Sequence, residues 1–165
     1  MAKDFSFDVV SDFDAGEMTN AVDQAQREVS QRYDFKGTSA KIEFSDGKNG
    51  LELVGDSRNQ LNALIDVIQG KLIRRDISPK ALDLSSEPTE SGTGMKWSIS
   101  FKRGLDQEKA KKLTKLIRSD FPKAKAQIQG DAVRVSSASK DDLQSIMSML
   151  RSQELDYPLQ FENYR

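Results

Sequence analysis

Apolar and polar residues follow two periods along this chain, and the period changes from one stretch to the next. Residues 5–10 alternate between apolar and polar side chains, which predicts a half-buried strand. Asp14 with Glu17 can cap a helix after it. The apolar stripe expected on that helix consists of Met18, Ala21, Val22, Ala25, Val29 and Tyr33. Gly37 suits the chain's exit from this helix, where a positive φ is often needed.

The next pattern predicts a hairpin, a helix and a short strand. Residues 41–45 and 51–54 alternate, and turn-forming residues 46–50 separate them. Ser57 begins a second capping box, and the helix after it has Leu61, Leu64, Ile65, Ile68 and Leu72 on one side. Residues 81–84 are expected to form a short strand. Residues 85–94 are rich in Ser, Gly, Thr and Pro, which predicts a linker or a mobile loop.

The same order of elements then recurs in the second half. A strand over 96–101 would have Trp97, Ile99 and Phe101 on one face, and capped helices begin near Asp106 and Ser139. A hairpin over 126–135 lies between those helices, and residues 159–161 end the pattern. The spacing of Ser57 to Ile65 matches that of Ser139 to Met147, which indicates an internal duplication. We therefore expect an α+β fold of two tandem ferredoxin-like βαββαβ domains, residues 1–90 and 95–165. Each would have a four-stranded antiparallel sheet and two helices on one face.

The composition excludes several kinds of chemistry. The 165 residues include no cysteine and no histidine, which leaves no thiolate nucleophile, no imidazole base and none of the usual zinc ligands. A phosphate loop is not expected at residues 92–96, because that segment leads into a strand and has no Ser or Thr after Lys96. Asp131, Asp141 and Asp142 are explained by a turn and a helix start. We expect a binding protein without catalytic residues, cofactor or metal.

Charge and hydropathy bear on partners and compartment. Residues 1–94 hold 11 Lys and Arg against 17 Asp and Glu, a net charge of −6, whereas residues 95–165 hold 14 against 9, a net of +5. A polyanion would prefer the second half, although a solvated helix face explains the lysines equally well. Charges occupy the start of the chain where a signal peptide needs an apolar core, and no apolar run approaches the ~20 residues of a membrane span. We expect a cytoplasmic protein that does not contact membranes.

Three groups of residues could contact phosphate or a base. The first is the segment with Arg32, Phe35 and Lys36, where arginine can clamp phosphate and an aromatic ring can stack; alternatively, it is a basic helix end with Tyr33 and Phe35 packed inward. The second is the basic end of the second predicted helix, at Arg74 and Arg75, which also suits the negative end of the helix dipole. The third is a polar sheet face, which could also be ordinary solvated surface. It comprises Lys125, Gln127, Gln129 and Arg134.

These motifs together resemble the bacterial YajQ family over essentially the full length. The resemblance is carried by residues 6–11, 20–23, 32–37, 71–75, 125–131, 134–135, 140–144 and 158–165. It implies two ferredoxin-like domains that exchange their first strands, so that residues 5–10 would join the second sheet and residues 96–102 the first. In that arrangement Lys96 and Lys102 would lie beside Lys41 and Glu43, and the second polar face beside Ser6 and Asp8. The resemblance also implies nucleotide binding and, for some members, a role as receptor for cyclic di-GMP.

The leading hypothesis is therefore a nucleotide-binding protein whose ligand is a purine nucleotide or a cyclic dinucleotide, with transmission to RNA, a transcription regulator or another protein. The candidate binding residues are Arg32, Phe35, Lys36, Arg74, Arg75, Lys125, Gln127, Gln129 and Arg134. The first alternative is an RNA-binding protein that uses the basic second half. A scaffold that binds only protein is the next alternative, and an enzyme is the last.

Overall fold

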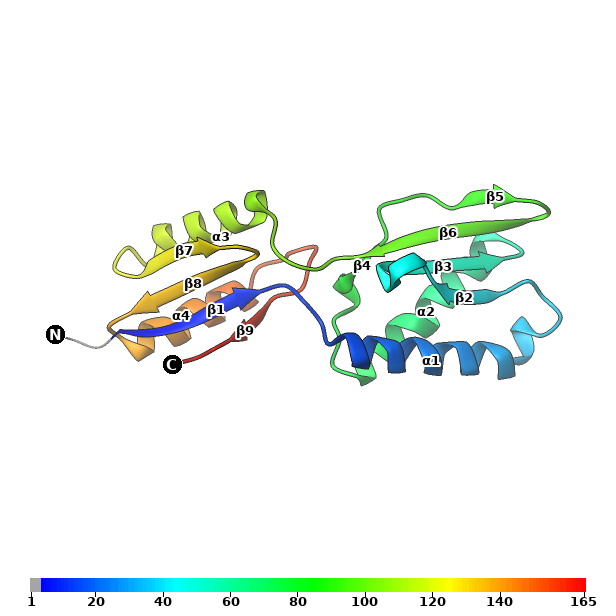
Figure 1. The fold of residues 1–165 in the computed structure, drawn as a ribbon, viewed down its shortest axis with the longest axis horizontal. Helices are drawn as coiled ribbons and strands as arrows, with labels where there is room; N and C mark the ends of the chain where they lie inside the picture. Colours follow the sequence, from blue (N-terminus) through cyan, green and yellow to red (C-terminus); the bar gives the residue numbers. More distant parts are fainter. Residues whose placement is uncertain (1–3) are drawn as a thin grey trace. The chain divides into compact units, whose positions relative to one another are not determined.

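The computed structural model describes residues 4–165, which form four α-helices and two antiparallel sheets (Figure 1). This confirms the predicted mixture of helices with antiparallel strands. The chain divides into two compact units. The central unit comprises residues 13–102. The terminal unit joins the described residues up to Asp12 with residues 103–165.

The central unit contains one sheet and two long helices. Its sheet has the strand order β2-β3-β6-β4, and β5 pairs with β6 beside that path. The elements are α1 (Ala15–Gln31), β2 (Lys41–Phe44), β3 (Gly50–Gly55), α2 (Arg58–Arg74), β4 (Leu82–Asp83), β5 (Thr89–Ser91) and β6 (Gly94–Phe101). Short 3-10 helices are formed by Tyr33–Phe35, Asp46–Lys48 and Pro79–Ala81. Strand β2 is therefore an edge strand.

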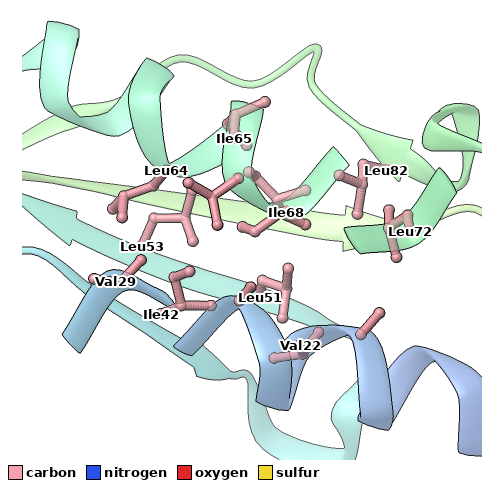
Figure 2. Packing of buried hydrophobic residues seen from close by; sticks show 14 of the residues in the cluster. Val22, Val29, Ile42, Leu51, Leu53, Leu64, Ile65, Ile68, Leu72 and Leu82 are labelled. Carbon is pink, nitrogen blue, oxygen red and sulfur yellow. The ribbon is translucent and has the colours of Figure 1, made fainter. Parts of the chain in front are cut away.

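The core of the central unit lies between its sheet and both helices (Figure 2). Alternate residues of β2, β3 and β6 point inward, as the twofold periodicity of a strand requires. Helices α1 and α2 contribute the stripes that the helical spacing predicted, among them Val22 and Leu64. The side-chain oxygens of Asp14 and Ser57 accept hydrogen bonds from the backbone N–H groups of Glu17 and Gln60, so both predicted caps are present. Caps of this kind stabilise a helix by roughly 1 kcal/mol each.

The segment expected to be a linker belongs to the central sheet. Residues 89–91 form β5, which pairs with residues 94–96 of β6 through a tight turn at Gly92 (φ 61°). Ser86 accepts a hydrogen bond from the Trp97 indole Nε1 at 3.0 Å through its carbonyl oxygen. The composition of residues 85–94 indicates irregular structure. In the protein, the pairing of β5 with β6 and the hydrogen bond from the Trp97 indole to Ser86 order this segment.

The terminal unit contains a four-stranded sheet and two helices. The strand order is β7-β8-β1-β9, so β1 lies between β8 and β9 and is antiparallel to both. The elements are β1 (Phe5–Val10), α3 (Gln107–Asp120), β7 (Lys125–Gln129), β8 (Ala132–Ser137), α4 (Lys140–Arg151) and β9 (Gln160–Glu162). Strand β1 comes from the start of the chain and all the other elements come from its second half. Likewise, β6 lies between β3 and β4 of the central sheet.

The core of the terminal unit repeats the arrangement of the central one. Phe7 and Val9 of β1 are fully buried against α3, α4 and the inner residues of β8. Asp106 and Ser139 cap the two helices as expected, through the N–H groups of Lys109 and Asp142. Both helices thus cover one face of the sheet, and the other face contains polar residues.

Helix α1 is shorter than the apolar stripe predicted. It ends at Gln31, because Arg32 adopts an extended conformation (φ −73°, ψ 133°). Tyr33 therefore does not continue the buried stripe and is 92% exposed, whereas Phe35 is 5% exposed. The alternative in which both rings pack inward is therefore wrong for Tyr33 and right for Phe35. Gly37 does have a positive φ of 75°, but it serves the turn after the 3-10 helix rather than the helix end.

One glycine allows two central strands to approach closely. A Cβ on Gly50 would collide with the carbonyl oxygen of Ile99 on β6, so no larger residue fits without moving a strand.

Among residues 4–165, none of the helices has the length and apolarity that a membrane crossing requires.

Candidate functional site

A cavity in the central unit lies between the second half of α1 and the edge strand β2. Its volume is about 520 Å³, within the range of small-molecule sites. Side chains from α1, from the turn that follows it and from β2 form its wall. They are Gln26, Val29, Ser30, Phe35, Lys36, Gly37, Ala40, Lys41, Ile42 and Glu43. Two candidates predicted from the sequence, Phe35 and Lys36, are thus brought together here.

The turn after α1 builds one end of this cavity. The 3-10 helix folds Phe35 back under α1, and the Phe35 carbonyl oxygen accepts hydrogen bonds from the N–H and the hydroxyl of Thr38. The Thr38 hydroxyl in turn accepts a hydrogen bond from the Ala40 N–H at 3.2 Å. These bonds leave Lys36 exposed at the rim. Its side chain makes no hydrogen bond or ion pair with any of residues 4–165, so its ammonium group is available to a ligand.

The edge of β2 forms the other wall. The Gln26 amide Nε2 donates a hydrogen bond of 2.8 Å to the Ile42 carbonyl oxygen, which satisfies a backbone acceptor that an edge strand leaves free. The Lys41 Nζ lies 2.7 Å from Glu43 Oε1, and both side chains are more than half exposed. The cavity therefore combines an apolar floor with two ammonium groups and one carboxylate at its rim.

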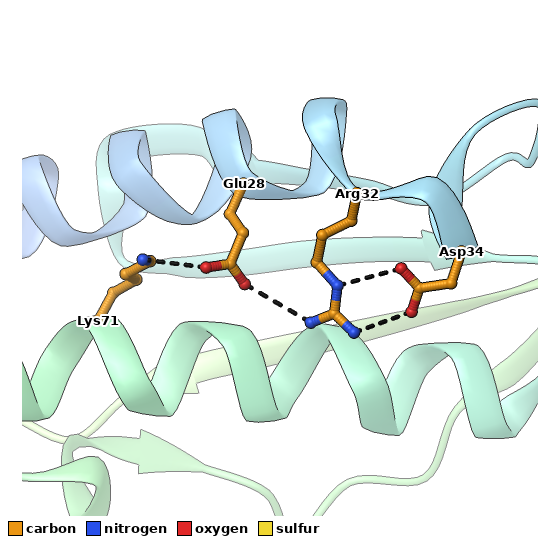
Figure 3. A network of polar contacts seen from close by, with 4 residues as sticks. All are labelled: Glu28, Arg32, Asp34 and Lys71. Carbon is orange, nitrogen blue, oxygen red and sulfur yellow. Dashed lines mark hydrogen bonds and ion pairs between the residues drawn. The ribbon is translucent and has the colours of Figure 1, made fainter.

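Arg32 does not join this cavity as a free cation. Its Nε and terminal nitrogen bind both carboxylate oxygens of Asp34, at 3.0 and 2.8 Å, and its other terminal nitrogen lies 3.5 Å from Glu28 (Figure 3). The hydrogen bond to Asp34 raises the pKa of the guanidinium above its ordinary value. Lys71 holds the other oxygen of Glu28 at 3.1 Å, and this hydrogen bond lowers the pKa of Glu28. A phosphate would have to displace these carboxylates.

Arg74 and Arg75 lie apart from the larger cavity. Arg74 lines a groove of about 180 Å³ between α1 and α2, together with Arg32 and Gly70. Arg75 lies at the end of α2 and forms an ion pair with Glu17 at 3.3 Å. The structure thus distributes the five candidates of the first half over three places.

The remaining candidates share the polar face of the terminal sheet. Lys125, Gln127 and Gln129 are alternate residues of β7 and are exposed. Arg134 belongs to β8 and lies between its two strand neighbours, Gln127 of β7 and Asp8 of β1. Its Nε and terminal nitrogen bind Asp8 at 2.9 and 3.3 Å. Together the four form an exposed polar surface rather than a cavity.

Asp8 itself is 8% exposed although it lies on that polar face. Besides Arg134, the Asn163 amide Nδ2 donates a hydrogen bond of 2.8 Å to it. The hydrogen bond from Arg134 is the largest cause that lowers the pKa of the carboxyl group, and burial opposes it. Arg134 is therefore engaged within the unit, whereas Lys125 and the two glutamines make no side-chain hydrogen bond or ion pair in the described part of the chain.

The two units differ far less in net charge than the two halves of the sequence do. On the sequence, the central unit has 12 Lys and Arg against 14 Asp and Glu, and the terminal unit has 13 against 12. The net charges are therefore −2 and +1 instead of −6 and +5. Acidic residues of the first strand region belong to the terminal unit, and Lys96 and Lys102 belong to the central one. Lys96 forms an ion pair with Glu52 of β3. In the sheet, Val54 of β3 lies between Lys96 of β6 and Lys41 of β2.

Sequence reasoning missed four polar residues of the cavity. Gln26 and Ser30 are exposed neighbours of the apolar stripe on α1, four residues apart, so helical spacing could have grouped them. Lys41 and Glu43 are the outward residues of a strand whose edge position the alternation alone does not reveal. Within the part of the chain that the structure describes, no group of three or more acidic, histidine or cysteine side chains could hold a metal ion.

Comparison with known proteins decides the family. The model of the family described as "Nucleotide-binding protein YajQ-like" matches residues 5–165. The chain belongs to this family. This confirms the resemblance inferred from the motifs.

Curated relatives of this chain match it over nearly their entire length. A protein of Thermobifida fusca named "Nucleotide-binding protein" is 48% identical over 166 residues, which is 100% of both chains. A Streptomyces coelicolor protein, also named as nucleotide-binding, is 50% identical over 163 residues, 98% of this chain and 99% of its own. A Nocardioides protein of that name is 47% identical with the same coverage. These names describe binding rather than a reaction.

Proposed function

We propose that this YajQ-like protein binds a nucleotide in the cavity between α1 and β2. The observation that carries the proposal is the composition of that cavity's wall. Val29, Phe35, Ala40 and Ile42 offer an apolar surface to a base. The unpaired Lys36 offers positive charge to phosphate, and Lys41 adds to it when a ligand displaces Glu43. The names of its relatives support the ligand class.

The ligand we favour is a purine nucleotide or a cyclic dinucleotide such as cyclic di-GMP. A purine has the larger flat surface to bury against the apolar floor, and Gln26, Ser30 and Glu43 can hydrogen-bond its edge. A cyclic dinucleotide has two phosphodiester charges, which the two lysines at the rim can neutralise. We propose that a receptor of this kind acts in the cytoplasm through a partner, either a transcription regulator or RNA.

We also propose that the two units are ferredoxin-like domains, divided in sequence at residues 1–90 and 95–165, which have exchanged their first strands. The position of β1 between β8 and β9, and that of β6 between β3 and β4, support this interpretation. The exchange makes each unit depend on both halves of the chain.

Calorimetric titration tests the ligand proposal. The protein is titrated with AMP, GMP, ATP, GTP, cyclic di-AMP and cyclic di-GMP, and at least one of them is expected to bind with a 1:1 stoichiometry. Lys36→Glu should weaken that binding at least tenfold, because the reversed charge repels phosphate. Lys80→Glu is the matched control, since Lys80 is exposed on the same unit but does not line the cavity. No heat at millimolar ligand would contradict the proposal.

RNA binding remains the second candidate because one lysine cluster has no carboxylate partners. Lys111, Lys112 and Lys115 are exposed on α3 and form no ion pair with residues 4–165. Such a surface can neutralise backbone phosphates. It predicts an affinity for single-stranded RNA that falls steeply with salt, with a logarithmic slope close to about −0.7 per phosphate neutralised. A flat salt response would exclude this mode.

A further inference from the structure

The outer ridge of α2 contains a pattern that interactions within the protein do not explain. Asp66, Gly70 and Arg74 follow one another at intervals of four residues, which places them on one side of the helix. All three are exposed. Ile73, on the same side, is 60% exposed, one of the most exposed large apolar side chains described. An apolar residue between two opposite charges is typical of a contact surface.

Gly70 has no structural need to be glycine. Its φ is not positive, and a Cβ added to it would meet no atom within 4 Å. Glycine inside a helix makes that helix less stable than alanine does. What glycine does allow is the close approach of another backbone. The groove of about 180 Å³ beside it shows that nothing from the described residues fills this space.

The charges on either side of Gly70 are complementary under a twofold rotation. Asp66 precedes the glycine by four residues and Arg74 follows it by four. Neither side chain makes a hydrogen bond or ion pair with any of residues 4–165. If two α2 helices cross antiparallel at Gly70, Asp66 of each copy faces Arg74 of the other.

We propose that α2 is a dimerisation surface on which two copies of this chain pack antiparallel about Gly70. The contact is isologous, so each favourable pair occurs twice and the assembly closes as a dimer. The second copy is a better occupant than an anion, because Asp66 and Glu28 line the groove alongside its three cations. The proposal is independent of the nucleotide cavity, which lies on the β2 side of α1.

Charge reversal tests the proposal on the full chain. Analytical ultracentrifugation over a range of concentrations should show a monomer–dimer equilibrium for the wild-type protein. Asp66→Arg and Arg74→Asp should each weaken dimerisation at least tenfold, because each creates two like-charge contacts per dimer. An equimolar mixture of the two variants should recover a heterodimer. In it, the arginine introduced into one copy faces the aspartate introduced into the other, and the second contact keeps the native pair. The double variant should also recover a homodimer.

Controls make every outcome decisive. Lys80→Asp, an exposed charge reversal away from the ridge, should leave the equilibrium unchanged. Circular dichroism should show native helix content for all variants, because both substituted side chains are exposed and unpaired in the protomer. A wild-type protein that stays monomeric at millimolar concentration would overturn the proposal. So would a dimer that survives both single reversals, or single variants that stay monomeric when mixed.

Discussion

Asp8 and Arg134 are 126 positions apart in the sequence but lie opposite each other on β1 and β8, with Arg134 Nε 2.9 Å from Asp8 Oδ1. The pair joins the first strand of the chain to the second half. Asn163, after β9, donates to the same carboxylate, so one acidic side chain connects three segments. Asp8 is nearly buried, and removing either of these donors leaves a carboxylate with too few partners.

This carboxylate should make stability depend on pH. The pKa of Asp8 is lowered in the folded protein, so its contribution is fully present above the unfolded-state pKa of about 4 and is lost as pH falls through the folded pKa. Asp8→Asn should lower the free energy of unfolding at pH 7 by roughly 1–3 kcal/mol. The difference from wild type should shrink below pH 4. Urea denaturation at pH 7, 4 and 3 measures it, and a difference that stays constant over this range would contradict the assignment.

Two glycine substitutions should have opposite effects on stability. Gly50→Ala should destabilise the protein by roughly 1–3 kcal/mol, because its Cβ would collide with the Ile99 carbonyl oxygen. Gly70→Ala should stabilise the protomer by roughly 0.5–1 kcal/mol, because its Cβ would meet open space and alanine favours the helix. Thermal unfolding at low protein concentration, where the protomer dominates, compares them. Equal melting temperatures would show that the approach of β3 to β6 is looser than described.

Two basic candidates of one motif should differ in their effect on ligand binding. Lys36→Ala should weaken nucleotide affinity by about tenfold, because Lys36 is unpaired among the described residues and lines the cavity. Arg32→Ala should change it less than twofold, because Asp34 and Glu28 already hold the guanidinium. Calorimetry on both variants measures the contrast. The reverse order of effects would move the site to the groove between α1 and α2.

Local signals predicted most elements of this fold. The four capping residues, the two hairpins and the helical stripes depend on neighbours within a few residues, and all are present except for Tyr33, which lies beyond the end of α1. Alternation shows that residues 5–10 form a strand but not which strand pairs with it, because pairing depends on contacts more than a hundred residues away. The same limit explains why β5 was not predicted. A segment rich in Ser and Thr indicates a loop, and only its pairing with β6 makes it a strand.

The candidate site was predictable only in part for a related reason. Phe35 and Lys36 follow a helix end, which local rules locate. Their partners Lys41 and Glu43 matter because β2 is an edge strand, which is a property of the whole sheet. The net charges of the two sequence halves do not predict those of the two units, because the units divide after Asp12 and after Lys102. Arg32 looked available as a phosphate clamp, but the sequence does not show that Asp34 and Glu28 converge on it.

Nucleotide binding in the cavity beside β2 is tested most sharply by a crystal structure of the protein with the nucleotide that binds tightest in the calorimetric panel. We expect the base against Phe35 and Ile42 and a phosphate within hydrogen-bonding distance of the Lys36 ammonium group. Density for the nucleotide elsewhere, on the polar face of the terminal sheet or in the groove beside Gly70, would contradict the proposed site.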